Sequence, residues 1–216
     1  MTTLPHDKSG SSSKSSAWSL ILANLIPLFG VFFWDWQVLD IVALYWAENI
    51  IIGFYNALRM AWVRSESGAG AEMIEKIFMI PFFVVHYGGF CAGHGVFLFT
   101  LLGSHAGING IEGVVWLIFG PLKWPLLALF LSHGFSFFWN FLHRGEYRKI
   151  TLSKQMFAPY SRIVALHIAI LAGGVAIQAA GQPLLLLIIL VIGKTVMDVK
   201  LHLRSHREKK EEAKEV

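Results

Sequence analysis

The stretch YWAENIIIGFYNALR, residues Tyr45–Arg59, decides the fold of this chain. It lies in an apolar run from about Val38 to Val63, which is long enough to cross a bilayer as a helix. At about 100° per residue, one face of this helix collects the polar side chains, namely Tyr45, Glu48, Asn49, Tyr55, Asn56 and Arg59. The opposite face is apolar and suits lipid.

A carboxyl group in the middle of a bilayer is costly unless it is neutral, paired or hydrated. Glu48 is the carboxyl group of this span, and the apolar opposite face leaves it only one direction in which to point. We therefore expect Glu48 to face the interior of a helical bundle. We also expect it to contact at least one polar group from another span.

Composition supports the same class of protein. The 216 residues are 55% hydrophobic and only 15% charged, and several apolar runs reach membrane length, so we expect one polytopic membrane domain. The net charge of +4 comes mostly from loops and the C-terminal end, which indicates contact with membrane lipid rather than nucleic acid. The single cysteine, Cys91, lies inside a span and is expected to be a packing residue.

The predicted fold is all-α: a membrane bundle of six transmembrane helices, with a short interfacial helix before the fourth span. Residues 1–16 are polar and Ser-rich and are expected to form a disordered cytoplasmic tail. Residues 17–203 would hold the six spans, and residues 204–216 a charged cytoplasmic tail. The run Trp18–Phe33 ends without a small-residue cleavage pattern, which favours a retained first span over a signal peptide.

The remaining boundaries follow from the apolar runs and the prolines. The later spans are placed at about Ile77–Leu102, Pro125–Leu142, Pro159–Ala180 and Pro183–His202, and the interfacial helix at about Gly113–Phe119. A polar connection, Arg64–Lys76, precedes the third span, and a basic loop, Arg144–Lys154, precedes the fifth. Lys and Arg gather in the two tails and in these two connections, which predicts cytoplasmic N- and C-termini. Four tryptophans would then form an aromatic belt at the outer interface: Trp34, Trp36, Trp116 and Trp124.

Polar side chains recur at similar depth on several spans. Glu48, His86, His133, His167 and Lys194 all fall near the middle third of the bilayer, each on the polar or small-residue face of its span. Three imidazoles and a carboxylate could form a zinc or iron site with His86, His133 and His167 as ligands. Glu48 would be a fourth ligand or a general base in metal-assisted hydrolysis of a lipid-soluble substrate. Hydrogen bonds behind the ligands would come from Tyr45, Asn49, Asn56, Ser136, Asn140, Lys194 and Asp198.

The third span has a further pattern, in the sequence HYGGFCAGHG of residues 86–95. Gly89 and Gly93 form a small-xxx-small pair, which would let another helix approach closely. His94 lies roughly 80° around the helix from His86 and about 12 Å further along it, so one straight helix cannot aim both at one ion. We therefore expect these two histidines to have different roles.

Three other functions compete with the metal site. The polar faces could line a path for protons or a small solute, with Glu48 and the histidines as relay groups. A histidine pair such as His86 with His133 or His167 could hold haem b. The polar contacts could also serve only to hold a scaffold together, with Glu48 paired to Lys194 or Arg59 and Lys194 neutralised by Asp198.

Sharp catalytic motifs are missing from the sequence. It contains no H-E-x-x-H pair, no Walker loop, no dinucleotide-binding glycine pattern and no paired C-x-x-C. The segments Ser132-His133-Gly134 and Gly103-Ser104-His105 do not match the nucleophile pattern of rhomboid proteases. Six spans alone therefore do not indicate a rhomboid.

The chain resembles an uncharacterised family of bacterial multi-pass integral-membrane proteins. The resemblance rests on Ala23-Asn-Leu-Ile-Pro27 in the first span and on Tyr45-Trp-Ala-Glu-Asn49, a Tyr-Trp-x-Glu-Asn motif, in the second, followed by Asn56. The hydropathy layout agrees over roughly residues 18–200. This resemblance implies location in the bacterial inner membrane and supplies no catalytic residue.

Overall fold

The computed structural model describes residues 25, 27–64, 69–103, 106–108, 110–148, 150–180, 184–196 and 199. These residues form helices and no strands. The named helices are α2 (Val38–Trp62), α3 (Ala69–Leu102), α4 (Gly110–Phe119), α5 (Lys123–Ser136), the π-helix η2 (Phe137–His143), the 3-10 turn η3 (Glu146–Arg148), α6 (Leu152–Phe157) and α7 (Tyr160–Ala180). Two further helical pieces comprise residues 27–33 and Leu184–Val196.

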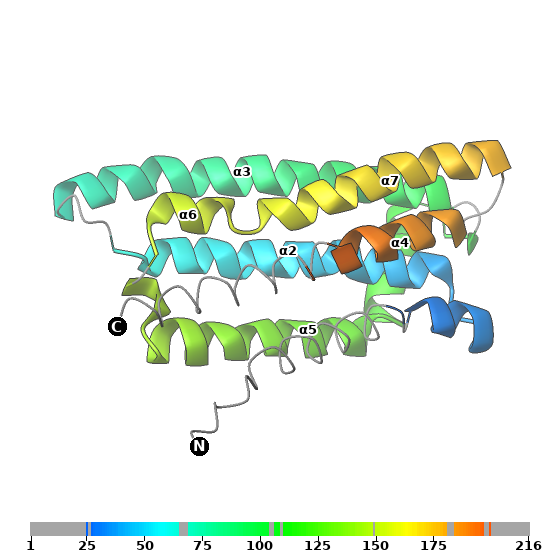
Figure 1. Ribbon diagram of the computed structural model, residues 1–216, viewed down its shortest axis with the longest axis horizontal. Helices are drawn as coiled ribbons and strands as arrows, with labels where there is room; N and C mark the ends of the chain where they lie inside the picture. Colours follow the sequence, from blue (N-terminus) through cyan, green and yellow to red (C-terminus); the bar gives the residue numbers. More distant parts are fainter. Residues whose placement is uncertain are drawn as a thin grey trace, which may run out of the picture.

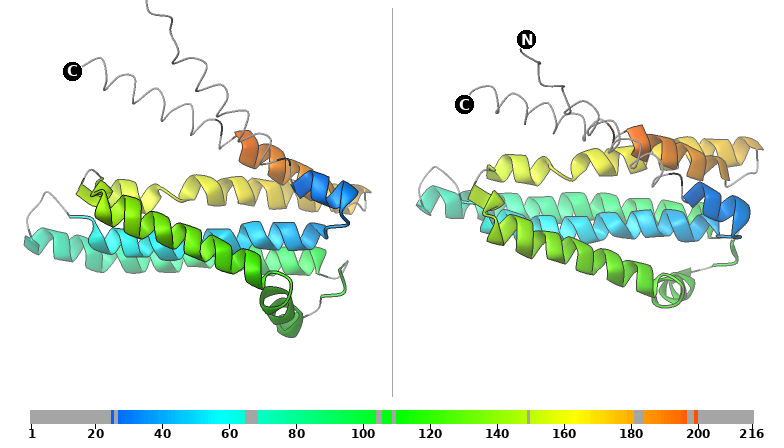
Figure 2. Two further views of the ribbon diagram at one scale, coloured as in Figure 1. Left: turned by 90° about the horizontal axis from the view of Figure 1, so that it is seen from below. Right: turned by 60° about the horizontal axis from the view of Figure 1, so that its bottom comes forward.

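Helix α2 is the centre of the bundle. It contacts α3, α5, α6 and α7, and Figure 1 shows it between α3 and α7 on one side and α5 on the other. The short helix α4 runs across one end of the bundle instead of along it (Figure 2). The helix that carries Tyr45–Arg59 therefore touches most of the other elements.

Four helical stretches are long and apolar enough to cross a membrane: Val38–Trp62, Gly70–Leu102, Lys123–His143 and Leu152–Val175. They correspond to the second, third, fourth and fifth predicted spans. The predicted interfacial helix is present as α4. Half of the first predicted span lies outside the described residues, and only the piece Leu184–Val196 of the sixth is a described helix. The all-helical class is confirmed, and the number of six spans stays a prediction.

Two polar segments that we expected to be connections are partly helical. Helix α3 begins at Ala69, before the predicted start of its span, and an ion pair of 2.6 Å between Glu72 and Lys76 joins successive turns there. Lys76 also donates a hydrogen bond to the carbonyl oxygen of Ala61 in α2. In the other segment, α6 begins after Thr151, whose hydroxyl accepts a hydrogen bond from the Lys154 backbone N–H. Local capping and pairing outweigh the polar composition of both segments.

Three arginines and the four predicted belt tryptophans lie at opposite ends of the bundle. The C-terminal end of α2, the start of α3 and the segment between α5 and α6 lie at the same end (Figure 1). Arg64, Arg144 and Arg148 belong to this end. Residues 34–37 and α4 belong to the opposite end, where the predicted belt residues Trp34, Trp36, Trp116 and Trp124 are exposed.

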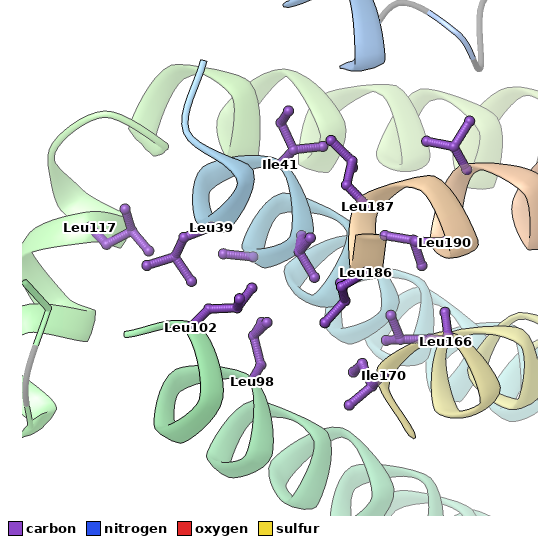
Figure 3. Packing of buried hydrophobic residues seen from close by; sticks show 14 of the residues in the cluster. Leu39, Ile41, Leu98, Leu102, Leu117, Leu166, Ile170, Leu186, Leu187 and Leu190 are labelled. Atoms are coloured by element: carbon purple, nitrogen blue, oxygen red, sulfur yellow. The ribbon is translucent and has the colours of Figure 1, made fainter. Parts of the chain in front are cut away.

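The buried side chains form two apolar clusters along α2. The first contains Leu39, Ile41, Val42 and Ala43 of α2 and packs against α3, α4, α7 and Leu184–Val196 (Figure 3). The second contains Tyr55 and Met60 of α2 and packs against α3, α6 and η2. Glu48 lies between the two sets of α2 residues. The Glu48 side chain therefore lies between two apolar clusters along α2.

Helices α2 and α3 pack closely where Gly53 meets Tyr87. A Cβ atom on Gly53 would lie 2.6 Å from Cε1 of the Tyr87 ring, and Tyr87 is 2% exposed. The Tyr87 hydroxyl donates a hydrogen bond of 3.2 Å to the Asn49 carbonyl oxygen, so the ring cannot swing away without losing this contact. Glycine at position 53 is therefore required by the packing.

We expect Gly53→Val to lower the free energy of unfolding by about 1–3 kcal/mol, because it overpacks a filled interface. The matched control is Gly88→Val on α3, where an added Cβ would meet no atom within 4 Å. Loss of the helical circular dichroism signal during titration with a denaturing detergent measures both variants. Equal stability of the two variants would contradict the close packing of Gly53 on Tyr87.

Candidate functional site

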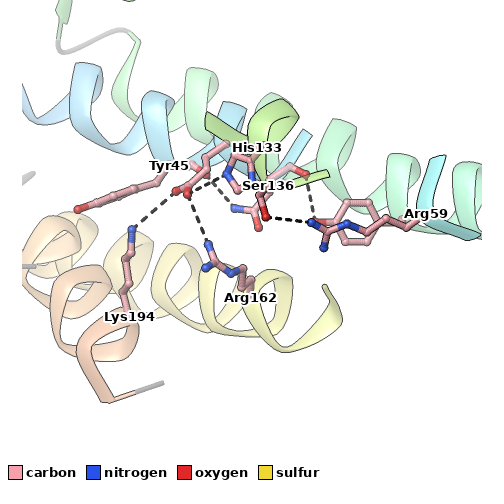
Figure 4. A network of polar contacts seen from close by, with 9 residues as sticks. Tyr45, Arg59, His133, Ser136, Arg162 and Lys194 are labelled. Atoms are coloured by element: carbon pink, nitrogen blue, oxygen red, sulfur yellow. Dashed lines mark hydrogen bonds and ion pairs between the residues drawn. The ribbon is translucent and has the colours of Figure 1, made fainter. Parts of the chain in front are cut away.

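Glu48 is the centre of a charge cluster built from four helices. It lies ten residues into α2, about 15 Å from Val38 along the helix axis. Its carboxylate lies 3.6 Å from Nε2 of His133 in α5, 3.5 Å from Nη1 of Arg162 in α7 and 3.7 Å from Nζ of Lys194 in Leu184–Val196. Figure 4 shows Arg162 and Lys194 approaching from one side and His133 from the other. The expectation that Glu48 faces the interior and contacts polar groups of other spans is confirmed.

The Glu48 carboxylate is shared between its partners. Oε1 faces both His133 and Arg162, and Oε2 faces Lys194. The Glu48 side chain is 16% exposed, so water screens these charges less than it would at a surface. The cluster therefore brings an arginine, a lysine and an imidazole to a single carboxylate among the described residues.

A small cavity adjoins the cluster. Its volume is about 30 Å³, and its lining includes Glu48, Asn49, Arg162 and Lys194. A space of about 10–15 Å³ on this measure is enough for one water molecule when polar partners surround it. The cavity is therefore large enough for one or two waters, or for one small ion, next to both cations.

Tyr45 and Asn49 support the cluster from α2. The Lys194 ammonium lies 4.3 Å from the centre of the Tyr45 ring, which is within the range of a cation–π interaction. The Asn49 side chain donates a hydrogen bond of 2.8 Å to the Tyr45 carbonyl oxygen. Tyr45 and Asn49 were both predicted to support the site residues by hydrogen bonds, and both line or adjoin the cavity beside Glu48.

Ser136 and Asn140 lie toward the end of the bundle that carries Arg64, Arg144 and Arg148. The Ser136 hydroxyl accepts a hydrogen bond of 3.4 Å from Nη2 of Arg59 and one of 3.5 Å from the Asn140 amide. The Arg59 guanidinium also lies 5.4 Å from the centre of the Phe141 ring. Arg59 thus contacts the α5–η2 helix, and its contacts differ from those of Glu48.

Asn56 pairs with a residue that sequence reasoning missed. Nε2 of Gln155 in α6 donates a hydrogen bond of 2.6 Å to Oδ1 of Asn56, and both side chains are buried. Gln155 directly follows the basic loop Arg144–Lys154 and precedes the predicted fifth span, so nothing marked it as an interior residue. The pair ties α6 to α2 near the end of the second apolar cluster.

We expect Gln155→Leu alone to destabilise the protein by about 1 kcal/mol, since it leaves the side-chain Oδ1 of Asn56 buried without its hydrogen-bond donor. The double variant Asn56→Leu with Gln155→Leu should recover part of this loss, because both polar groups are then removed. A double-mutant cycle on detergent-induced unfolding gives the coupling energy. Strictly additive single effects would show that the two amides do not interact.

The three histidines predicted as metal ligands have three different partners. His133 faces Glu48, His86 shares a hydrogen bond of 3.0 Å with the Tyr160 hydroxyl, and Nδ1 of His167 lies 2.7 Å from Nε2 of His94. Among the described residues, no group of three or more His, Cys, Asp or Glu side chains could hold a metal ion. The structure therefore does not assemble the predicted zinc or iron ligand set. The candidate haem pairs, His86 with His133 or with His167, are likewise engaged with other residues.

Arg162 is the residue of the Glu48 cluster that sequence reasoning missed. It follows Pro159 by three positions, where a span boundary is expected, and it lies off the face that carries Tyr160 and His167. An arginine within a few residues of a span end is ordinarily read as an interfacial anchor. The predicted partner Lys194 is present in the cluster, whereas Asp198 lies outside the described residues.

Among the described residues, four apolar helices of membrane-crossing length around a partly buried ion cluster indicate the class of protein: a membrane-embedded helical bundle. The chain belongs to a family of unknown function, DUF6498, whose model matches residues 6–215. No curated protein and no solved structure matches this chain. The expected membership of an uncharacterised family is thereby confirmed. The bacterial source of the family and its Tyr-Trp-x-Glu-Asn motif stay predictions.

Proposed function

We propose that this protein is a proton-coupled carrier of a small anion, with the Glu48 cluster as its binding site. The single observation that carries the proposal is that one interior carboxylate is shared by Arg162 and Lys194 from two other helices. Both cations are only partly buried among the helices, and they attract an anion more strongly than surface cations because less water competes for them. Glu48 occupies the position that such an anion would take.

Competition within the cluster supplies the coupling. An anion that binds Arg162 and Lys194 displaces the Glu48 carboxylate from both cations. A carboxylate left in an apolar interior without its counter-charges gains affinity for a proton. His133, 3.6 Å from Oε1, is placed to exchange that proton with Glu48. Anion binding and protonation of Glu48 would then favour each other, as linkage requires.

Size and orientation complete the proposal. The cavity beside Arg162 and Lys194 accepts only a small ion unless the helices separate, which favours chloride-sized anions. We place the chain in the bacterial inner membrane as a six-span protein, with the end that carries Arg64, Arg144 and Arg148 on the cytoplasmic side. Metal-assisted hydrolysis at His86, His133 and His167 is a weaker alternative, because these side chains do not converge.

The test uses purified protein in liposomes that contain a pH-sensitive dye. A chloride gradient should drive proton movement with the wild type. Arg162→Met should reduce this movement by about tenfold or more, because it removes one of the two anion-binding cations. The control is Arg148→Met, since Arg148 is exposed at a loop and contacts Tyr147 instead of the cluster. The proposal fails if chloride, phosphate and pyruvate gradients all move no more protons than empty liposomes do.

A further inference from the structure

A second cavity lies between α3 and α7, away from the Glu48 cluster. Its volume is about 370 Å³, within the size range of small-molecule sites, and its lining includes His86, Gly89, Phe90, Gly93, His94 and His167. Phe90 is 42% exposed and Leu171 47% exposed, so the cavity opens on the apolar outer surface of the bundle. A ligand would therefore enter it from the lipid.

Polar side chains occur at two levels of this groove. His86 and Tyr160 share a hydrogen bond at one level, and His94 and His167 share another at the second level. His86 and His94 are eight residues apart on α3, which separates the levels by about 12 Å. His94 is 5% exposed, and its Nε2 lies 2.7 Å from Nδ1 of His167. The groove thus offers hydrogen-bonding groups at two points of an otherwise apolar wall.

Gly89 and Gly93 form the floor between these two levels. A Cβ atom on either residue would meet no atom of the described chain within 4 Å. We expected this pair to let another helix approach closely, but the helix backbone at both positions instead faces open space. A bare stretch of helix backbone between two histidines leaves room for a flat ring.

We propose that this groove binds a molecule of the quinone class: a lipid-soluble compound with a flat ring, oxygen atoms at opposite ring edges and an apolar tail. The two ring oxygens would meet the His86–Tyr160 and His94–His167 levels. The ring would lie over Gly89 and Gly93, and the tail would leave past Phe90 and Leu171 into lipid. None of the lining residues is Lys, Arg, Asp or Glu, which disfavours an anionic phospholipid headgroup in the same place. This site is independent of the proposed anion site.

The test measures binding of a decyl-chain benzoquinone to the purified protein in nanodiscs. The wild type should bind it saturably, above its partition into empty nanodiscs. Gly93→Leu and Gly89→Leu should each weaken binding by about tenfold or more, because a leucine side chain fills the ring position. The matched control is Gly88→Leu, which has equal free space but lines a cavity on another face of α3. Its binding should equal that of the wild type.

Three results would overturn the assignment. The first is equal affinity in the wild type and all three leucine variants, which would mean that the compound only dissolves in the bilayer. The second is binding by the wild type no greater than that of empty nanodiscs. The third is co-purification of a phospholipid that Gly93→Leu displaces while quinone affinity does not change. Thermal unfolding of each variant shows whether a lost affinity reflects the groove or a misfolded chain, and the two glycine positions provide independent tests.

Discussion

Replacing Glu48 with leucine is expected to lower the free energy of unfolding by about 2 kcal/mol, less than for a fully buried ion pair because Arg162 and Lys194 are partly exposed. Leucine itself suits a bilayer, so the loss comes from the residues left behind. Arg162 and Lys194 would keep their charges inside the bundle without the carboxylate that both contact. Removing one partner from a buried ion cluster costs more than removing the whole cluster.

The rescue variant makes this reasoning testable. Adding Arg162→Met and Lys194→Met to Glu48→Leu should restore most of the lost stability, because no unpaired charge then remains in the cluster. The helical circular dichroism signal, followed during titration with a denaturing detergent, gives the stability of Glu48→Leu and of the triple variant. If the triple variant is less stable than Glu48→Leu, the ion cluster is not the source of the destabilisation.

The second large expected effect is on the coupling of proton flux to chloride flux. Glu48→Gln keeps the shape of the side chain but removes the group that we propose binds the coupled proton, so a chloride gradient should move chloride without protons. We expect the ratio of proton flux to chloride flux to fall about tenfold or more, since the coupling depends on one titratable group. Chloride movement itself should persist, because Arg162 and Lys194 remain.

The control for this experiment is Asp35→Asn. Asp35 is exposed, lies before α2 and has a backbone φ of 52°, a conformation that asparagine adopts readily and leucine does not. Its flux ratio should equal that of the wild type. An unchanged ratio in Glu48→Gln, or an equal loss in both variants, would remove Glu48 from the coupling mechanism.

The inward orientation of Glu48 could be predicted because it depends on one helix alone. The helical period sets the face, and the cost of a carboxyl group in lipid sets the direction. Whether His86, His133 and His167 point toward one common position could not be predicted in this way. Depth along a span follows from residue number, whereas the rotation of each helix about its axis depends on packing. His167 pairs with His94, which lies about 12 Å along α3 from His86, so the predicted ligands share neither a level nor a partner.

The residues that sequence reasoning missed have a common physical cause. Arg162 and Gln155 both lie near inferred boundaries of spans, where polar residues are expected to face water. Helix α6 instead packs on α2 and carries Gln155 into the interior, and α7 turns Arg162 toward Glu48. Interactions between helices decide the environment of a boundary residue, and these are not visible in the apolar pattern of one span.

Labelling of the native protein with a lipid-soluble carbodiimide tests the central claim most directly. This reagent attacks carboxyl groups that it can reach from the bilayer, and mass spectrometry of peptides locates the adduct. Glu48 that is enclosed and held by Arg162 and Lys194 should stay unlabelled in the wild type and become labelled in the Arg162→Met, Lys194→Met variant. Labelling of Glu48 at the same rate in both proteins would show that its carboxyl group faces lipid, and would contradict the account.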